Sequence, residues 1–342
     1  MRRLAVIIGL LALVAIAAVA QDSGEPAESD GFLVNLLERR LSTPTRQIRL
    51  HGITGALSSR ARIAQVTISD QDGNWLEVDN VELDWSRLAL LRGRVNVNRL
   101  SAERIVWSRR PAAAAPPTGP QLPKAEATPF ALPELPVSIN LAELALADIE
   151  FAEPVFGQAA RISVGGSLNL ARGVLESDIA VRRLDGPGGE LTLRAGFSNA
   201  TRQLDVDLDL HEPEGGIVAT LLRIEGTPAI DLTAEGSGPL DGVDVSFALD
   251  AGGTRIADGL VALNSGAEGL GFDVDFAGEI APLVPPDFRD FFAGEGTVQV
   301  KGISKAGGGL RISTLAVDGP VLRLEGDLET CLLYTSPSPR DS

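Results

Sequence analysis

The segment Leu204-Asp-Val-Asp-Leu-Asp-Leu210 decides the fold class, because apolar and acidic residues alternate in it without a break. Successive side chains of a β-strand point to opposite faces, so this period predicts a strand with one aliphatic and one acidic face. Other segments repeat the pattern. Their apolar positions are Leu191, Leu193, Ala195 and Phe197, then Leu204, Val206, Leu208 and Leu210, then Val243, Val245, Phe247 and Leu249, and finally Phe272, Val274 and Phe276.

The rest of the chain supports an all-β fold built on a long antiparallel sheet. Short alternating segments separated by Gly, Pro, Asn or Asp fill residues 46–110 and 137–330. They are interrupted by residues 85–93, a helical turn or a loop, and by residues 285–292, a helical turn. A long sheet must hide its apolar face in a sandwich or barrel, by dimerising, or around a ligand. The pattern alone favours a closed sandwich or barrel over the alternative that it also allows, a curved sheet with an open apolar groove.

The amino end predicts export. Met1-Arg-Arg3 precedes seventeen apolar or small residues, Leu4 to Ala20, which as a helix reach roughly 25 Å, near the lower limit for a membrane span. Ala18-Val-Ala20 fits a signal-peptidase site, so residues 1–20 are either an uncleaved anchor or a cleaved signal. In both cases the later residues face outward, which in a Gram-negative cell is the periplasm.

Composition divides the remaining chain. Residues 21–45 are expected to hold a short amphipathic helix, with Phe32, Leu33, Leu36, Leu37 and Leu41 at helical spacing. Residues 46–110 form a first β module, and residues 111–136, with eight prolines and seven alanines, form a linker or exposed loop. Residues 137–330 form a repetitive β region. Residues 331–342 break the alternation and resemble a translated sequencing adapter, so the natural chain is expected to continue beyond Thr330.

Composition also excludes several functions. There are 46 acidic against 30 basic residues, a net charge of -16, so the chain has no basic surplus with which to bind nucleic acid. The single cysteine, Cys331, falls in the anomalous tail, so no thiol chemistry is expected. The acidic residues are explained as the solvated faces of strands.

No constellation for catalysis, cofactor binding or metal binding is present in the sequence. The two histidines, His51 and His211, are 160 residues apart, which disfavours a zinc site or a Ser-His-Asp triad. Asp70-Gln-Asp-Gly-Asn74 lacks calcium-loop spacing and is interpreted as a hairpin turn. The sequence therefore predicts a protein that is not an enzyme.

Several segments together resemble the TamB family, the inner-membrane subunits of the translocation and assembly module. They are Ile48-Arg-Leu-His-Gly-Ile-Thr-Gly-Ala-Leu-Ser-Ser59, then Ile68 to Leu76 and Val81 to Gly93, and further on Glu212-Pro-Glu-Gly-Gly216. The resemblance implies an uncleaved single-pass inner-membrane anchor at residues 4–20 and a long sheet curled into a taco-shaped groove, as in AsmA-like and bridge-like lipid transfer proteins. It also implies an outer-membrane barrel partner, TamA, contacted through a carboxy-terminal domain beyond residue 330.

The implied function is conduction of phospholipid acyl chains between the inner and outer membranes. The groove would be lined by the apolar positions named above for residues 191–197, 204–210, 243–249 and 272–276, except Ala195. With the resemblance included, the open groove is favoured over the closed sandwich. Two alternatives stay open: a scaffold for the assembly or secretion of outer-membrane β-barrel proteins and autotransporters, which would hold strands by β-augmentation, and a passive spacer.

Overall fold

The computed structural model describes residues 38, 42–43, 45–55, 58–90, 94–112, 138–266, 268–284, 286–305 and 309–330. The predicted anchor at 1–20, nearly all of the predicted linker at 111–136 and the tail at 331–342 lie outside these residues. So does the predicted amphipathic helix, except for Glu38, which is helical.

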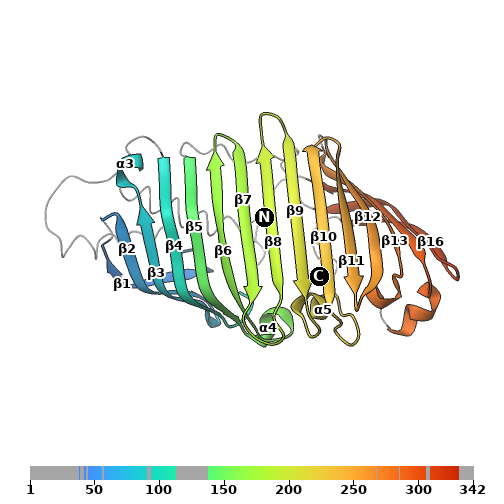
Figure 1. The fold of residues 1–342 in the computed structure, drawn as a ribbon, viewed down its shortest axis with the longest axis horizontal. Coiled ribbons are helices and arrows are strands. Elements are labelled where there is room, and N and C mark those ends of the chain that lie inside the picture. Colours follow the sequence, from blue (N-terminus) through green and yellow to red (C-terminus); the bar gives the residue numbers. More distant parts are fainter. Residues whose placement is uncertain are drawn as a thin grey trace, which may run out of the picture.

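Sixteen strands form one sheet in sequence order (Figure 1). The strands are β1 Gln47–Thr54, β2 Arg60–Asp70, β3 Gly73–Trp85, β4 Arg94–Trp107, β5 Ser138–Phe151, β6 Ala160–Ala171, β7 Val174–Arg183, β8 Glu190–Ser198, β9 Gln203–Glu212, β10 Ile230–Pro239, β11 Val243–Ala251, β12 Thr254–Gly266, β13 Gly269–Gly278, β14 Gly296–Lys305, β15 Leu310–Asp318 and β16 Arg323–Thr330. The expected all-β class and long sheet are confirmed.

One strand pair departs from the antiparallel expectation. β4 and β5 are parallel, with Arg94 opposite Ser138 and Trp107 opposite Phe151. Parallel neighbours require a connection long enough to return to the starting edge of the sheet. Residues 108–137 provide that length, whereas the other strand pairs are antiparallel, including the two pairs joined by residues 213–229 and 279–295.

The sheet is curved and open. β1 and β16 are its two ends and do not pair with each other, so the described strands do not close into a barrel, and all of them belong to one sheet rather than to two packed layers. Figure 1 shows the curvature, because β12 to β16 turn progressively edge-on. The closed sandwich or barrel that the sequence pattern alone favoured is therefore wrong for this part of the chain. Whether a sheet closes depends on which strands pair with each other, and the alternation of apolar and polar residues does not specify that pairing.

Short helices lie at the strand ends: α3 Arg87–Leu90, α4 Glu153–Phe156, α5 Ile217–Leu221, η1 Ala281–Leu283 and η2 Pro286–Phe292. The helical turns expected near 85–93 and 285–292 are confirmed by α3 and η2, whereas α4 and α5 were not expected. Asp70 pairs with Gly73 across a two-residue turn, which confirms the hairpin interpretation.

The buried core is divided between the two rims of the sheet, where the strands end. At the upper rim of Figure 1, Trp85, Val97 and Ile139 are buried together, as are Phe197, Leu240 and Val243 further along. At the lower rim, separate clusters form around Ile48, Phe151, Ile230 and Ile280. The middle of each strand lies between these clusters.

Candidate functional site

The pairing register places apolar side chains on one face of every strand. Cross-strand partners point to the same face of a sheet, so they can be followed from strand to strand. One line of partners crosses fifteen strands without a charged or polar side chain, and we call it the apolar row. Its members, from β2 to β16, are Ala61, Leu83, Leu100, Leu144, Gly166, Ile179, Leu193, Leu208, Ala234, Phe247, Gly259, Phe276, Val298, Val317 and Leu324.

The positions expected to line a groove all lie on this face. Leu193, Leu208, Phe247 and Phe276 belong to the apolar row itself. The other ten lie in neighbouring lines of the same face: Leu191, Phe197, Leu204, Val206, Leu210, Val243, Val245, Leu249, Phe272 and Val274. The apolar face extends to strands on both sides of the predicted positions; on β7, for example, it includes Ile179 and Val181. The same alternation of apolar and polar residues in the sequence could have identified these positions.

Burial separates the rims of this face from its middle. Phe197, Leu210 and Val243 are buried in the rim clusters, whereas the remaining eleven predicted positions are half-buried. A half-buried uncharged band therefore runs across the strands of this curved sheet between two packed rims, and we call this band the apolar trough. Such a surface excludes charge and favours hydrocarbon, because burial of apolar area is favourable by about 25 cal/mol per Å².

Two short helices build the lower wall of the trough. Glu212, only 4% exposed, accepts hydrogen bonds from the backbone N–H groups of Ile217 (Oε1, 2.5 Å) and Val218 (Oε2, 2.7 Å), which holds α5 against the end of β9. Gly216 allows this approach, because a Cβ there would lie 2.0 Å from Glu212 Cδ. The hydroxyl of Thr220 on α5 donates to Gln158 Oε1 (3.2 Å) just after α4, so the two helices are linked.

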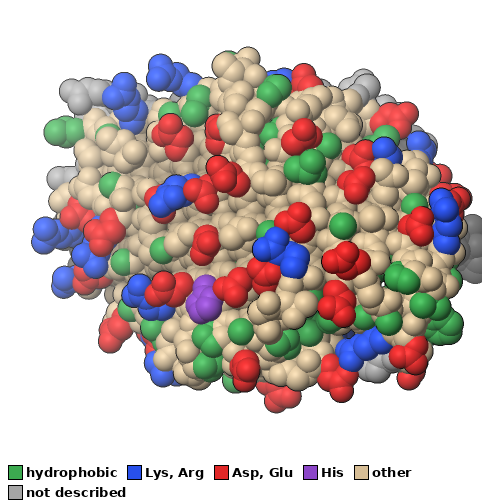
Figure 2. All heavy atoms as spheres, turned by 45° about the vertical axis from the view of Figure 1, so that its right-hand side comes forward, with side chains coloured by type: hydrophobic (Ala, Val, Ile, Leu, Met, Phe, Trp, Pro, Cys, Tyr) green, Lys and Arg blue, Asp and Glu red, His purple; other side chains and the backbone are tan. Residues whose placement is uncertain are grey.

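The opposite face of the sheet is polar. Arg194 on β8 contacts Asp207 (Nη1–Oδ2, 3.1 Å) on one side and Asp178 (Nε–Oδ2, 3.6 Å) on the other. Glu150 accepts from Arg104 (2.8 Å), and this hydrogen bond lowers the pKa of the carboxyl. Figure 2 shows acidic and basic side chains interspersed over such a surface, with hydrophobic side chains gathered toward its lower edge. These contacts confirm that Asp207 lies on a solvated strand face.

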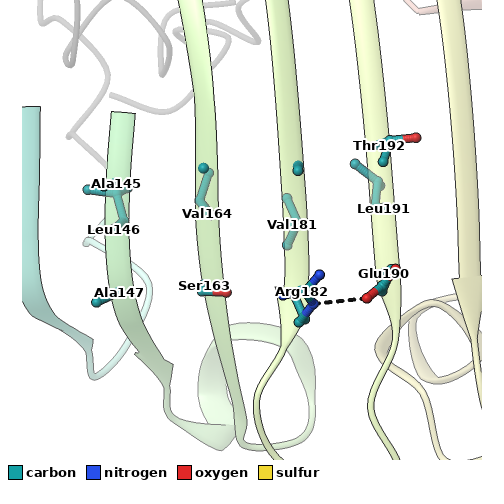
Figure 3. A pocket seen from close by; sticks show the side chains of 12 residues that line it. Ala145, Leu146, Ala147, Ser163, Val164, Val181, Arg182, Glu190, Leu191 and Thr192 are labelled. Atoms are coloured by element: carbon teal, nitrogen blue, oxygen red, sulfur yellow. Dashed lines mark hydrogen bonds and ion pairs between the residues drawn. The ribbon is translucent and has the colours of Figure 1, made fainter. Parts of the chain in front are cut away.

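A shallow hollow on the polar face arises from small residues. Ala145, Gly165, Ala180 and Thr192 follow one another in the pairing register from β5 to β8. The ion pair between Arg182 and Glu190 (2.9 Å) borders them (Figure 3). The floor is the backbone of the strands, since these side chains are too short to fill the surface. We assign no ligand to this hollow.

The histidines are not brought together into a reactive site. His51 lies on β1, and His211 on β9 is paired with Asp231 (Nδ1–Oδ1, 2.5 Å). Within the described ranges, no group of three or more His, Cys, Asp or Glu side chains is placed to hold a metal ion.

In the part of the chain that the structure describes, no helix combines the length and apolar character needed to cross a membrane. Residues 4–20, the expected anchor, fall outside that part.

The model of the YdbH-like family, described as intermembrane phospholipid transport protein YdbH, matches residues 10–239. Searches of curated proteins and of solved structures found no match. The family match supports the AsmA-like bridge superfamily that the sequence analysis expected, but it does not support TamB specifically.

Proposed function

We propose that the apolar trough carries the acyl chains of phospholipids between two membranes. The premise is that the chain belongs to the YdbH-like family of intermembrane phospholipid transport proteins. The observation that carries this proposal is the uncharged apolar row, which runs through fifteen strands from Ala61 to Leu324. A charge facing hydrocarbon without a partner costs several kcal/mol, so a path for acyl chains requires such a row.

The polar face fits the same role. Its charged side chains keep the outside of the sheet in water, while each CH₂ group that leaves water for the trough is stabilised by about 0.8 kcal/mol. Phospholipid headgroups would stay at the open side of the trough, where water is available to them. Movement would be passive with respect to the chain, since the sequence contains no nucleotide-binding motif.

Inner-membrane anchoring belongs to the same proposal. Residues 4–20 would hold the chain in the inner membrane as a single-pass protein, with the sheet in the periplasm. A partnership with the barrel protein TamA is a finer proposal that rests on the resemblance of Ile48 to Ser59 and neighbouring segments to TamB. The scaffold and spacer alternatives have no structural observation that favours them over the conduit.

The proposal is tested by lipid content. The full chain, purified in mild detergent, is expected to carry phospholipid detectable by extraction and native mass spectrometry. Val245→Asp places a carboxylate on the half-buried apolar face and should remove most of that lipid, and Leu208→Asp should do the same within the apolar row itself.

The matched control is Ser246→Asp, one residue along β11, whose side chain is exposed on the polar face. It adds the same charge and should leave the lipid content unchanged. A folded protein that carries no phospholipid, or equal lipid loss in Val245→Asp and Ser246→Asp, would count against the conduit.

A further inference from the structure

The first strand has an edge that no other described strand covers, yet its backbone groups are occupied. β1 pairs with β2 on one side only. On the other side, the N–H of Ile48 donates to Ser42 Oγ (3.0 Å) and the N–H of Leu50 donates to Glu38 Oε1 (2.8 Å). The Ser42 hydroxyl also lies 3.5 Å from the carbonyl oxygen of Ile48. Side chains thus take the positions that a neighbouring strand would use.

A turn returns the preceding chain to this edge. Thr43 and Arg46 exchange backbone hydrogen bonds of 2.7 and 3.1 Å, which brings Ser42 back along β1. Glu38 is held from a second direction as well, because its Oε2 lies 4.0 Å from Arg49 Nη1. The Glu38 side chain is only 17% exposed, so it is packed against the strand rather than extended into solvent.

The second half of the edge is bent. Gly52 has a φ of +64° and is missing from the register between His51–Gln65 and Ile53–Ile63. A Cβ at this position would lie 2.8 Å from the Cβ of Ala64, so a side chain is excluded as well as strained. A positive φ does not fit the extended backbone of a strand, so the edge at Gly52 departs from the flat geometry that a further strand would need.

An open strand edge is a template for another strand, and proteins block it with charged side chains, bulges or covering segments. β1 has two of these, the charged side chain of Glu38 and the covering segment at Ser42, in addition to the break at Gly52. We propose that Glu38 and Ser42 seal the β1 edge against strand addition by a second copy of this chain, so that the sheet is terminated at this end. The inference goes beyond lipid transport and does not depend on it.

The test removes the two side chains from the full chain and measures its mass by sedimentation velocity in detergent over a range of protein concentrations. Glu38→Ala with Ser42→Ala is expected to turn a monomer into a concentration-dependent dimer. The matched control is Glu235→Ala with Ser246→Ala, which deletes the same two side-chain types from β10 and β11, strands already paired on both edges. The control should stay monomeric.

A cross-link identifies the edge that pairs. If two β1 strands met in antiparallel fashion through Ile48 and Leu50, the Arg49 residues of the two copies would face each other as a non-hydrogen-bonded pair with Cα atoms about 4.5 Å apart. That separation is within disulfide range. In a Cys331→Ser background, Arg49→Cys should form a disulfide dimer only when Glu38 and Ser42 are replaced.

Circular dichroism checks that the variants keep their strand content, and amide exchange at Leu208 in the middle of the sheet checks that they stay folded. A folded Glu38→Ala, Ser42→Ala variant that stays monomeric at every concentration would overturn the proposal. So would dimerisation without the Arg49→Cys cross-link, or equal dimerisation of the control.

Discussion

The rings of Phe247 and Phe276 meet edge to face, 5.9 Å apart at their centroids, across the strand that lies between them. The position between them in the apolar row is Gly259 on β12. A Cβ at Gly259 would lie 2.1 Å from the carbonyl oxygen of Asp275 and 2.5 Å from the Cβ of Phe276. Because Gly259 has no side chain, the rings of Phe247 and Phe276 can meet over it. They therefore keep the surface of the trough continuous across β12.

Gly259→Ala should destabilise the protein by about 1–3 kcal/mol, because the new methyl group forces backbone or ring displacement in a packed site. Urea unfolding at neutral pH measures the change. Gly242→Ala is the control, since a Cβ there meets nothing within 4 Å. Equal stability of the two variants would show that the rings do not depend on the glycine.

Glu212→Ala should cost about 1–3 kcal/mol, because two partly buried backbone N–H groups of α5 lose their acceptor. Glu212→Gln keeps one carbonyl oxygen and should cost less. Hydrogen exchange measures the local effect: the amides of Ile217 and Val218 should lose protection before those of central β9. Unchanged protection of these two amides would contradict the role assigned to Glu212.

His211 should make stability depend on pH. A hydrogen bond to Asp231, followed by the charges of Asp231, Asp209 and Glu190, raises the pKa of the imidazole above 6.5. The folded state therefore binds the His211 proton more tightly than the unfolded state does. The resulting contribution to the free energy of unfolding is fully present below the pKa of His211 in the unfolded chain, and it is lost as pH rises through the pKa of His211 in the folded protein. The pair is exposed, so the effect is small.

Urea midpoints measured from pH 5.5 to 9 should show this loss in the wild type. Asp231→Asn removes the partner carboxylate, so the midpoints of wild type and variant should differ most at the acidic end and converge at the basic end. A difference between them that grows with pH would have the wrong sign for this pair.

Ala234→Trp should obstruct the trough by size without adding a charge. Ala234 lies in the apolar row between Leu208 and Phe247, so a bulky indole there would project into the path. Transfer of a fluorescent phospholipid between liposomes should slow several-fold. Thr233→Trp, on the polar face of the same strand, should leave the rate unchanged, and equal slowing by both would indicate general distortion.

Strands and faces could be predicted from local pattern, because alternation such as that of Leu204 to Leu210 has one regular structure that satisfies it. The parallel joining of β4 and β5 could not, since alternation is the same whichever way a strand runs. The choice between an open and a closed sheet depends on pairing between distant strands. The hydropathy of individual positions does not specify which strands pair.

The lower rim was missed for a different reason. α4 and α5 have only four and five residues, too short for helical periodicity to appear. The contact of Glu212 with Ile217 and Val218 is local in the chain, but it requires the turn through Gly216 to bring the carboxylate to the helix start. The seal on β1 likewise joins Glu38 to Leu50, twelve residues apart, through a turn that hydropathy does not reveal.

The uniformity of the apolar row has a kinetic consequence. Strands are spaced about 4.8 Å apart, so fourteen steps from Ala61 to Leu324 make a path of roughly 67 Å. In the proposed conduit each step would exchange one set of apolar contacts for another, and no step would meet a charged side chain. A guest molecule would then make a one-dimensional random walk across the strands. Its net flux would follow the difference in supply between the two ends.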